Sequence, residues 1–129
     1  MEIISTSEEE TIKLGRNIGE SLTGKEVICL LGEIGAGKTT LVKGIAQGMG
    51  IFESYQVRSP TFTLVNEYPT KKGRLIHIDL YRVDEFDFKE FIGEGVVVIE
   101  WAKDMDCCDI IISIEFVPKG RLLRITRFR

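Results

Sequence analysis

The sequence GEIGAGKT at residues 32–39 decides the fold of this 129-residue chain. It fits the pattern G-x-x-x-x-G-K-[S/T], in which glycines let successive backbone N–H groups wrap an anion just before a helix begins. An apolar run at residues 27–31 precedes it, and Leu41, Ile45 and Met49 recur at helical spacing after it. Strand, glycine loop and helix together form a P-loop, so the stretch predicts a site for nucleotide phosphates.

Two side chains of this loop carry the chemistry of the pattern. The ammonium group of Lys38 is expected to reach the β- and γ-phosphates, and the hydroxyl of Thr39 to ligate Mg²⁺. A chance glycine turn would match the four fixed positions in roughly half a per cent of chains of this length. The flanking strand and helix make chance matching rarer still, so we interpret the stretch as a nucleotide site.

The rest of the chain predicts one α/β P-loop domain over residues 1–129, with a mixed parallel and antiparallel sheet flanked by helices. Ser7 followed by Glu10 has the form of a capping box at the start of the first helix. Turn residues between neighbouring strands indicate two hairpins, which makes the sheet mixed. Strands are expected at residues 1–5, 27–31, 62–68, 74–80, 96–101, 110–117 and 122–128, helices at 8–22 and 40–49, and a short helix or ordered loop at 83–92.

Two apolar strands end in a carboxylate. Asp79 closes one and Glu100 the other, which is the form of the strand that holds Mg²⁺ in P-loop enzymes. The ends of such strands converge on the nucleotide, so both are candidates to bind metal and orient water. His77 shares a strand face with Asp79, but a lone histidine on a strand is more typical of structure than of catalysis.

A loop at residues 57–63 carries several hydroxyls and a proline. One interpretation is a plain loop, since Pro60 favours extended geometry at the residue before it. The other is a switch loop in which the hydroxyls of Ser59, Thr61 and Thr63 approach the nucleotide.

Composition narrows the class of protein. The net charge of −3 argues against a dedicated nucleic-acid binder. The C-terminal arginines at positions 121, 124, 127 and 129 have two interpretations: they protect an edge strand by their charge, or they form a contact surface for an acidic partner or RNA. The acidic start of the chain is unlike a signal peptide and no apolar run approaches a membrane span, so a cytoplasmic location is expected. The cysteines at positions 29, 107 and 108 form no zinc pattern and are expected to be reduced thiols.

Four stretches in this order resemble the bacterial TsaE family, the small ATPases of tRNA threonylcarbamoyladenosine biosynthesis. The likeness covers about residues 5–101. It differs in a short segment between Arg82 and Val96 and in Ala102, where the family commonly has proline. The stretches that carry the resemblance are GEIGAGKTT at 32–40, SPTFTLV at 59–65, HIDLYR at 77–82 and VIEW at 98–101.

The resemblance implies ATP and Mg²⁺ as cofactors and slow hydrolysis by the protein alone. It also implies TsaD and TsaB as partners, which attach a threonylcarbamoyl group to adenosine 37 of tRNAs reading codons that start with A, so that tRNA is met only through the complex. It implies three kinds of site residue: catalytic Lys38, Asp79 and Glu100; nucleotide-binding Ile34, Gly35, Ala36, Gly37, Lys38, Thr39 and Thr40, with Ser7 and Glu8 beside the adenine; and Thr39, Glu100 and Asp79 at the metal.

Two other functions fit the same motif. A small-molecule or nucleoside kinase also carries a P-loop, but it needs a lid and an acceptor pocket that this chain does not visibly encode. A nucleotide-gated binding module without significant turnover cannot be separated from a slow ATPase by sequence.

Overall fold

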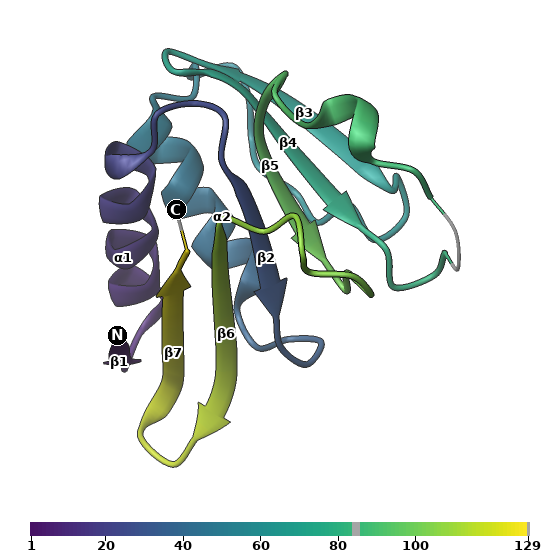
Figure 1. Ribbon diagram of the computed structural model, residues 1–129. Helices are drawn as coiled ribbons and strands as arrows, with labels where there is room; N and C mark the ends of the chain where they lie inside the picture. The colour runs from purple at the N-terminus through teal and green to yellow at the C-terminus, as the bar shows by residue number, and fades with distance from the viewer. Residues whose placement is uncertain (84–85, 129) are drawn as a thin grey trace.

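The computed structural model describes residues 1–83 and 86–128 of the chain (Figure 1). Within them, seven strands form one sheet in the order β1-β7-β6-β2-β5-β4-β3. The elements are β1 (Glu2–Ser5), α1 (Glu8–Ser21), β2 (Val27–Leu31), α2 (Lys38–Met49), β3 (Val65–Thr70), β4 (Gly73–Asp79), the 3₁₀ turn η1 (Lys89–Phe91), β5 (Gly95–Glu100), β6 (Ile110–Val117) and β7 (Gly120–Arg127).

The sheet is mixed, as the sequence predicts. Strands β6, β2, β5 and β4 run parallel to one another at its centre. The outer pairs β3–β4, β6–β7 and β1–β7 are antiparallel. The central strands are nearly continuous apolar runs because both of their faces are covered, which is typical of parallel strands.

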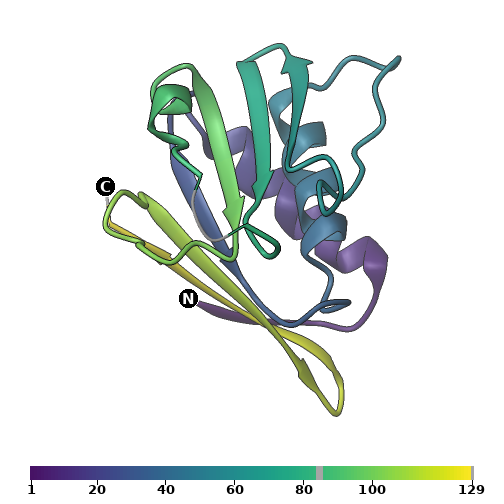
Figure 2. The ribbon, with the colours of Figure 1, turned by 90° about the vertical axis from the view of Figure 1, so that its right-hand side faces the viewer.

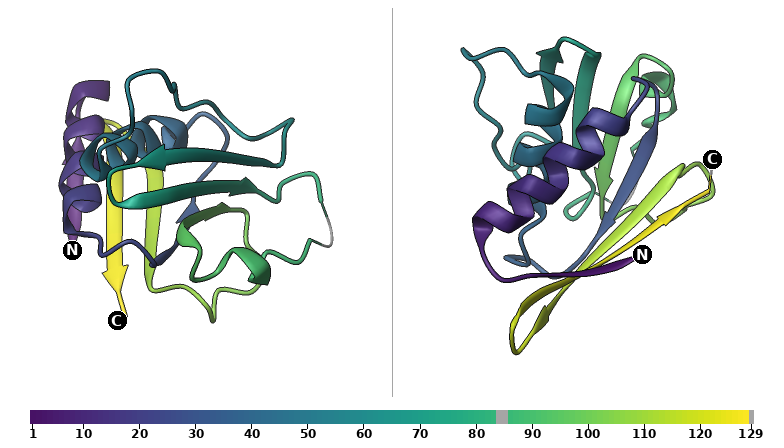
Figure 3. Two further views of the ribbon diagram at one scale, coloured as in Figure 1. Left: turned by 90° about the horizontal axis from the view of Figure 1, so that it is seen from above. Right: turned by 90° about the vertical axis from the view of Figure 1, so that its left-hand side faces the viewer.

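The two faces of the sheet have separate apolar cores. The helices α1 and α2 cover one face of the sheet (Figure 3). Side chains of the sheet such as Leu30, Val98 and Ile112 form one buried cluster there with Leu41 and Ile45 of α2. On the opposite face, aromatic side chains of residues 86–91 and the start of the segment after β5 pack on β4 and β5. This arrangement leaves the ends of β2, β4 and β5 free to build a site.

A glycine seam joins the two helices. Gly15 and Gly19 of α1 face Gly44 and Gly48 of α2, and a Cβ added at any of the four would lie 2.2–2.4 Å from a backbone oxygen of the other helix. Small residues let the helix backbones approach closely, and here the approach leaves no room for a methyl group. The seam therefore fixes α1, with its N-terminus, relative to the helix that follows the P-loop.

The start of α1 differs slightly from the predicted capping box. The Ser7 hydroxyl accepts from the Glu10 N–H (3.1 Å), as expected. The Glu10 carboxylate, however, accepts from the N–H of Thr6 (2.8 Å) instead of that of Ser7. Two side chain–backbone hydrogen bonds therefore still cap the N-terminus of α1.

Two predicted elements differ most from the structure in their bounds, and the ends of the others differ by at most two residues. The strand expected at 62–68 begins at Val65, because Leu64 has φ 71° and breaks the extended chain. It then continues through Pro69, which is tolerated because β3 is an edge strand. Of the segment 83–92, η1 is the helical part, and residues 84–85 lie outside the described residues.

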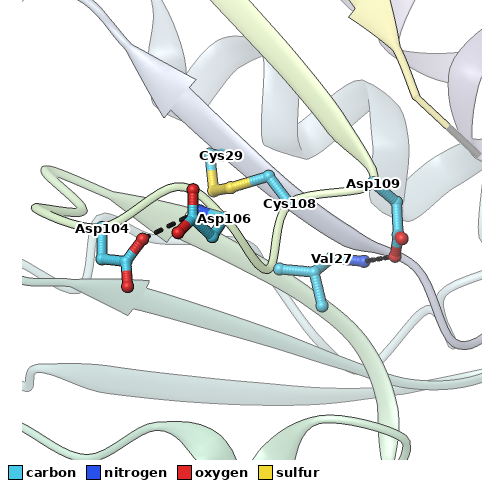
Figure 4. The surroundings of a disulfide bond; sticks show 6 residues. All are labelled: Val27, Cys29, Asp104, Asp106, Cys108 and Asp109. Carbon is cyan, nitrogen blue, oxygen red and sulfur yellow. Dashed lines mark hydrogen bonds between the residues drawn. A yellow bond between two sulfur atoms is a disulfide. The ribbon is translucent and has the colours of Figure 1, made fainter.

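The prediction of reduced thiols is wrong for Cys29 and Cys108. Cys29 of β2 and Cys108, just before β6, form a disulfide with Cα atoms 6.0 Å apart (Figure 4). They come together because β2 and β6 are neighbours in the sheet, and the Asp109 carboxylate accepts from the Val27 N–H (2.8 Å) at the same junction. Sequence reasoning could not see a contact between residues 79 positions apart.

The C-terminal arginines do not protect an edge strand, because β7 lies between β1 and β6. Each described arginine has its own contact. Arg124 pairs with Glu2 (2.7 Å) and Glu115 (3.0 Å), and Arg127 donates to the hydroxyl of Ser21 (3.1 Å). Arg121 points to the P-loop, and position 129 lies outside the described residues. In the described part of the chain, no helix is long and apolar enough to cross a membrane.

Candidate nucleotide-binding site

The loop between β2 and α2 opens onto a cavity of about 430 Å³ at the carboxyl ends of β4 and β5. Parallel strands that end at one edge of a sheet bring their last side chains together, which is where α/β proteins bind ligands. The register agrees, since Asp79 and Glu100 are direct neighbours across β4 and β5. The cavity is lined by Ile34, Gly35, Gly37, Lys38, Thr39, Thr40, Ser59, Thr61, Asp79, Tyr81, Arg82, Glu100 and Trp101.

Lys38 lies in the wall of this cavity and is 6% exposed. Its Nζ donates to the Gly32 carbonyl oxygen (2.7 Å) and lies 3.4 Å from Oε1 of Glu100. It also lies 4.3 Å from the centre of the Trp101 ring. A buried ammonium needs such partners, and the carbonyl, the carboxylate and the aromatic face each supply negative charge to Lys38.

Glu100 is held from both sides. Its Oε2 lies 2.5 Å from Nε2 of His77, while Lys38 lies near Oε1. Burial raises the pKa of the Glu100 carboxyl, but the hydrogen bond and electrostatic interaction with His77, together with the charge of Lys38, outweigh this effect and bring the pKa below its ordinary value. The carboxylate is therefore ionised, and the His77 Nε2–H donates to it.

His77 breaks a general rule of protein interiors. Its side chain is 0% exposed, and among the described residues its Nδ1 has no hydrogen-bond partner. An unpaired buried nitrogen costs about 1–3 kcal/mol. This cost is tolerated at a position where the other nitrogen orients Glu100, so His77 belongs to the site although its sequence pattern is more typical of structure.

Trp101 turns the chain sharply after Glu100. It has φ 63°, a left-handed conformation that is uncommon for a bulky residue and concentrates at functional sites. The turn places its indole beside Lys38 and 4.9 Å from the Tyr81 ring. The two aromatic rings thus shape one wall of the cavity.

The predicted switch loop is connected to the end of β4 by hydroxyl groups. The Ser59 Oγ and Thr61 Oγ1 lie 2.7 Å apart, and Thr61 Oγ1 donates to Oδ2 of Asp79 (3.1 Å). Thr63 points elsewhere, to a side chain of β3. Any group that competes for Asp79 would therefore also act on the conformation of this loop.

A second cavity of about 270 Å³ also borders the P-loop. It is built from the β1–α1 junction, the loop and the start of β7. Ser7 and Glu8 both line it together with residues of the loop, and their role at the adenine stays a prediction. The full lining is Ser5, Thr6, Ser7, Glu8, Thr11, Gly35, Ala36, Gly37, Thr40, Gly120 and Arg121.

Comparison with known proteins gives a consistent family. The family model described as "Threonylcarbamoyl adenosine biosynthesis protein TsaE" matches residues 5–123. The chain belongs to the TsaE family. A relative in Aquifex aeolicus, named tRNA threonylcarbamoyladenosine biosynthesis protein TsaE, is 55% identical over 127 residues, which cover 98% of this chain and 96% of the relative. A relative of the same name in Nostoc sp. is 42% identical over 113 residues, covering 80% of this chain and 68% of the relative.

The fold is shared with a solved structure. The crystal structure of YdiB from Bacillus subtilis superposes with a TM-score of 0.83 and 30% sequence identity. The match covers 98% of this chain and 84% of that one. Both the family and the α/β fold with a mixed sheet, expected from the motifs, are thereby confirmed.

The structure gathers the site residues expected from the sequence into the two cavities. Their roles toward a nucleotide or metal stay predictions. Sequence reasoning gave His77 no role in the site. It also passed over Tyr81 and Arg82, although both stand in the HIDLYR stretch that carries the family resemblance. Arg121 had no local signal, because its place depends on the β6–β7 hairpin reaching the P-loop.

Proposed function

We propose that this protein is a Mg²⁺-dependent ATP-binding protein and a slow ATPase. It supports TsaB and TsaD in threonylcarbamoyl modification of adenosine 37 in tRNAs that read codons starting with A. The observation that carries the proposal is the convergence of the P-loop, the switch-loop hydroxyls and two strand-end carboxylates on one cavity. Membership of the TsaE family supports the pathway, and the pathway in turn supports a cytoplasmic location.

The donor set fits Mg²⁺. The cavity brings together the Thr39 hydroxyl and the carboxylates of Asp79 and Glu100, all of them oxygen donors. Within residues 1–83 and 86–128, no group of three or more His, Cys, Asp or Glu side chains could hold a metal by itself. Mg²⁺ is commonly bound in this way, by few protein ligands together with substrate phosphates.

When bound, Mg²⁺ would supply positive charge against the negative charge that develops on the phosphates. Lys38 would leave Glu100 and Gly32 for the β- and γ-phosphates. Asp79 would orient the attacking water or the water shell of the metal. Because Thr61 donates to Asp79, the switch loop would respond to whatever Asp79 contacts, which supplies a route from nucleotide state to partner binding.

The proposal predicts that catalysis is mostly positioning and charge neutralisation. Lys38→Ala removes the phosphate contact and the ion pair together, so we expect loss of ATP binding or of turnover. The measurement follows fluorescence of Trp101, the single tryptophan, while ATP or ADP is added with Mg²⁺ or with EDTA. Phosphate release is then measured with and without TsaB and TsaD.

Three outcomes separate the possibilities. Binding by the wild type with hydrolysis that rises in the presence of the partners supports the proposal. Normal hydrolysis by Lys38→Ala would refute the site assignment. Binding that partners do not affect would leave the nucleotide site standing but favour a kinase or an unrelated nucleotide switch.

A further inference from the structure

A side chain of the β6–β7 hairpin, that of Arg121, contacts the P-loop. The hairpin extends beyond the rest of the sheet (Figure 2), and Arg121 stands at the start of β7. Its Nε donates to the carbonyl oxygen of Ala36 (3.0 Å), in the middle of the phosphate loop. The two residues are 85 positions apart, so this contact exists only in the folded protein.

The guanidinium of Arg121 is itself held in place. Its Nη1 donates to the Gly120 carbonyl oxygen (3.2 Å), and its Cζ lies 4.1 Å from the centre of the Phe116 ring. Gly120 lies so close to β1 that an added Cβ would be 2.2 Å from the Ser5 carbonyl oxygen. These contacts restrain the Arg121 guanidinium beside the Ala36 carbonyl oxygen.

The contact decides the direction of one peptide group. The N–H and C=O of a trans peptide point in opposite directions, and the described chain has no cis peptide bond. When the Ala36 C=O points to Arg121, the Gly37 N–H of the same peptide points away from it. Gly37 has φ 110°, a backbone conformation that favours glycine. It also borders both cavities.

The conformational freedom of Gly37 can also work against phosphate binding. A glycine peptide can rotate with little steric resistance, and a P-loop binds phosphate only if its N–H groups converge on the anion. We propose that Arg121 is a positioning residue for the nucleotide phosphates, which fixes the 36–37 peptide through the Ala36 carbonyl and so orients the Gly37 N–H. This inference rests on the proposed nucleotide-binding function.

The test separates phosphate binding from base binding. Arg121→Met keeps an unbranched apolar stem beside Phe116 but cannot donate to Ala36. We expect affinity for inorganic tripolyphosphate and for ATP to fall by about tenfold alike, the loss typical of one charge-assisted hydrogen bond. Affinity for adenosine should not change, and Arg121→Lys should recover part of the loss.

Arg127→Ala is the matched control, because Arg127 stands on the same strand and donates to Ser21 instead of the loop. The inference is overturned if Arg121→Met binds tripolyphosphate like this control, or if adenosine affinity falls while tripolyphosphate affinity does not. A wild type that fails to bind ATP would refute the proposed function instead. The two failures are therefore distinguishable.

A second measurement does not depend on any variant folding. In the wild type labelled with ¹⁵N, the Gly37 amide should show a downfield proton shift on titration with tripolyphosphate, since a hydrogen bond to an anion deshields it. An unshifted Gly37 amide in saturated protein would overturn the inference even if Arg121→Met did not fold.

Discussion

The glycine seam between α1 and α2 can be tested by adding one methyl group. In Gly44→Ala, the new Cβ would lie 2.2 Å from the Ile12 carbonyl oxygen and 2.9 Å from the Gly15 Cα, whereas ordinary contact begins at 3.4 Å. Both neighbours are backbone atoms, so the helices must separate by about 1.2 Å. Overpacking costs about 1–3 kcal/mol, and a rigid neighbour puts this case near the upper end.

Part of that cost is offset, because alanine is a better helix former than glycine by about 1 kcal/mol. The net loss is then about 2 kcal/mol, and for a domain of this size it lowers the melting temperature by roughly 7 °C. Thermal unfolding without nucleotide measures it. Since α1 carries Ser7 and Glu8 to the second cavity, we also expect weaker nucleotide binding from the same variant.

Lys43→Ala is the matched control, since Lys43 is the exposed neighbour on the same helix. It changes helix propensity little and touches no seam, so its stability should equal that of the wild type. If Gly44→Ala were as stable as this control or more stable, the close approach of the two helices would not be a constraint and the reasoning would be refuted.

Three further predictions follow from particular contacts. Reducing the disulfide between Cys29 and Cys108 should lower the melting temperature by up to about 15 °C, which corresponds to the full chain-entropy estimate of about 4.5 kcal/mol for such a loop. Thiol titration of the denatured protein should find two thiols fewer before reduction than after it. Equal thiol counts would contradict the bond. The pKa of Glu100 lies below its ordinary value of 4.5, so the ionised carboxylate stabilises the fold above pH 4.5, and this stabilisation is lost as the pH falls further. In urea unfolding, the free energy of unfolding should therefore fall less steeply below pH 5 in Glu100→Gln than in the wild type. Parallel pH dependences in the two proteins would contradict this. His77→Leu should weaken Mg²⁺-dependent ATP binding by about tenfold to a hundredfold, whereas His77→Gln, which can still donate to Glu100, should keep most of the ATP affinity. Equal affinities in the two variants would mean that His77 does not act through Glu100.

The centre of the fold could be predicted from the sequence because its signals are local. An apolar run before the glycine loop and helical spacing after it place β2 and α2 without knowledge of the rest of the chain. The strand-end acids were found in the same way, and Asp79 and Glu100 do stand side by side. Parallel strands that share an edge need no further information to bring those two side chains together.

The errors and omissions have another physical origin. The disulfide, the place of β7 inside the sheet and the contact of Arg121 with Ala36 all depend on strand order. Strand order is set by the packing of distant segments, and no single stretch encodes it. The late start of β3, after Leu64, is different. A left-handed leucine contradicts its local preference, and its backbone is held by hydrogen bonds with Pro60 and Asp79.

The charges of the site explain why its parts must act together. Asp79 is 5% exposed and Glu100 4%, and buried carboxylates are costly unless a positive group balances them. In the structure described here, Lys38 is the cation near Glu100, with His77 as hydrogen-bond donor on the other oxygen. A nucleotide that draws Lys38 to its phosphates removes this balance and adds negative charge of its own. We therefore expect a cation to enter with the nucleotide, and the proposed dependence on Mg²⁺ rests on the ion pair between Lys38 and Glu100.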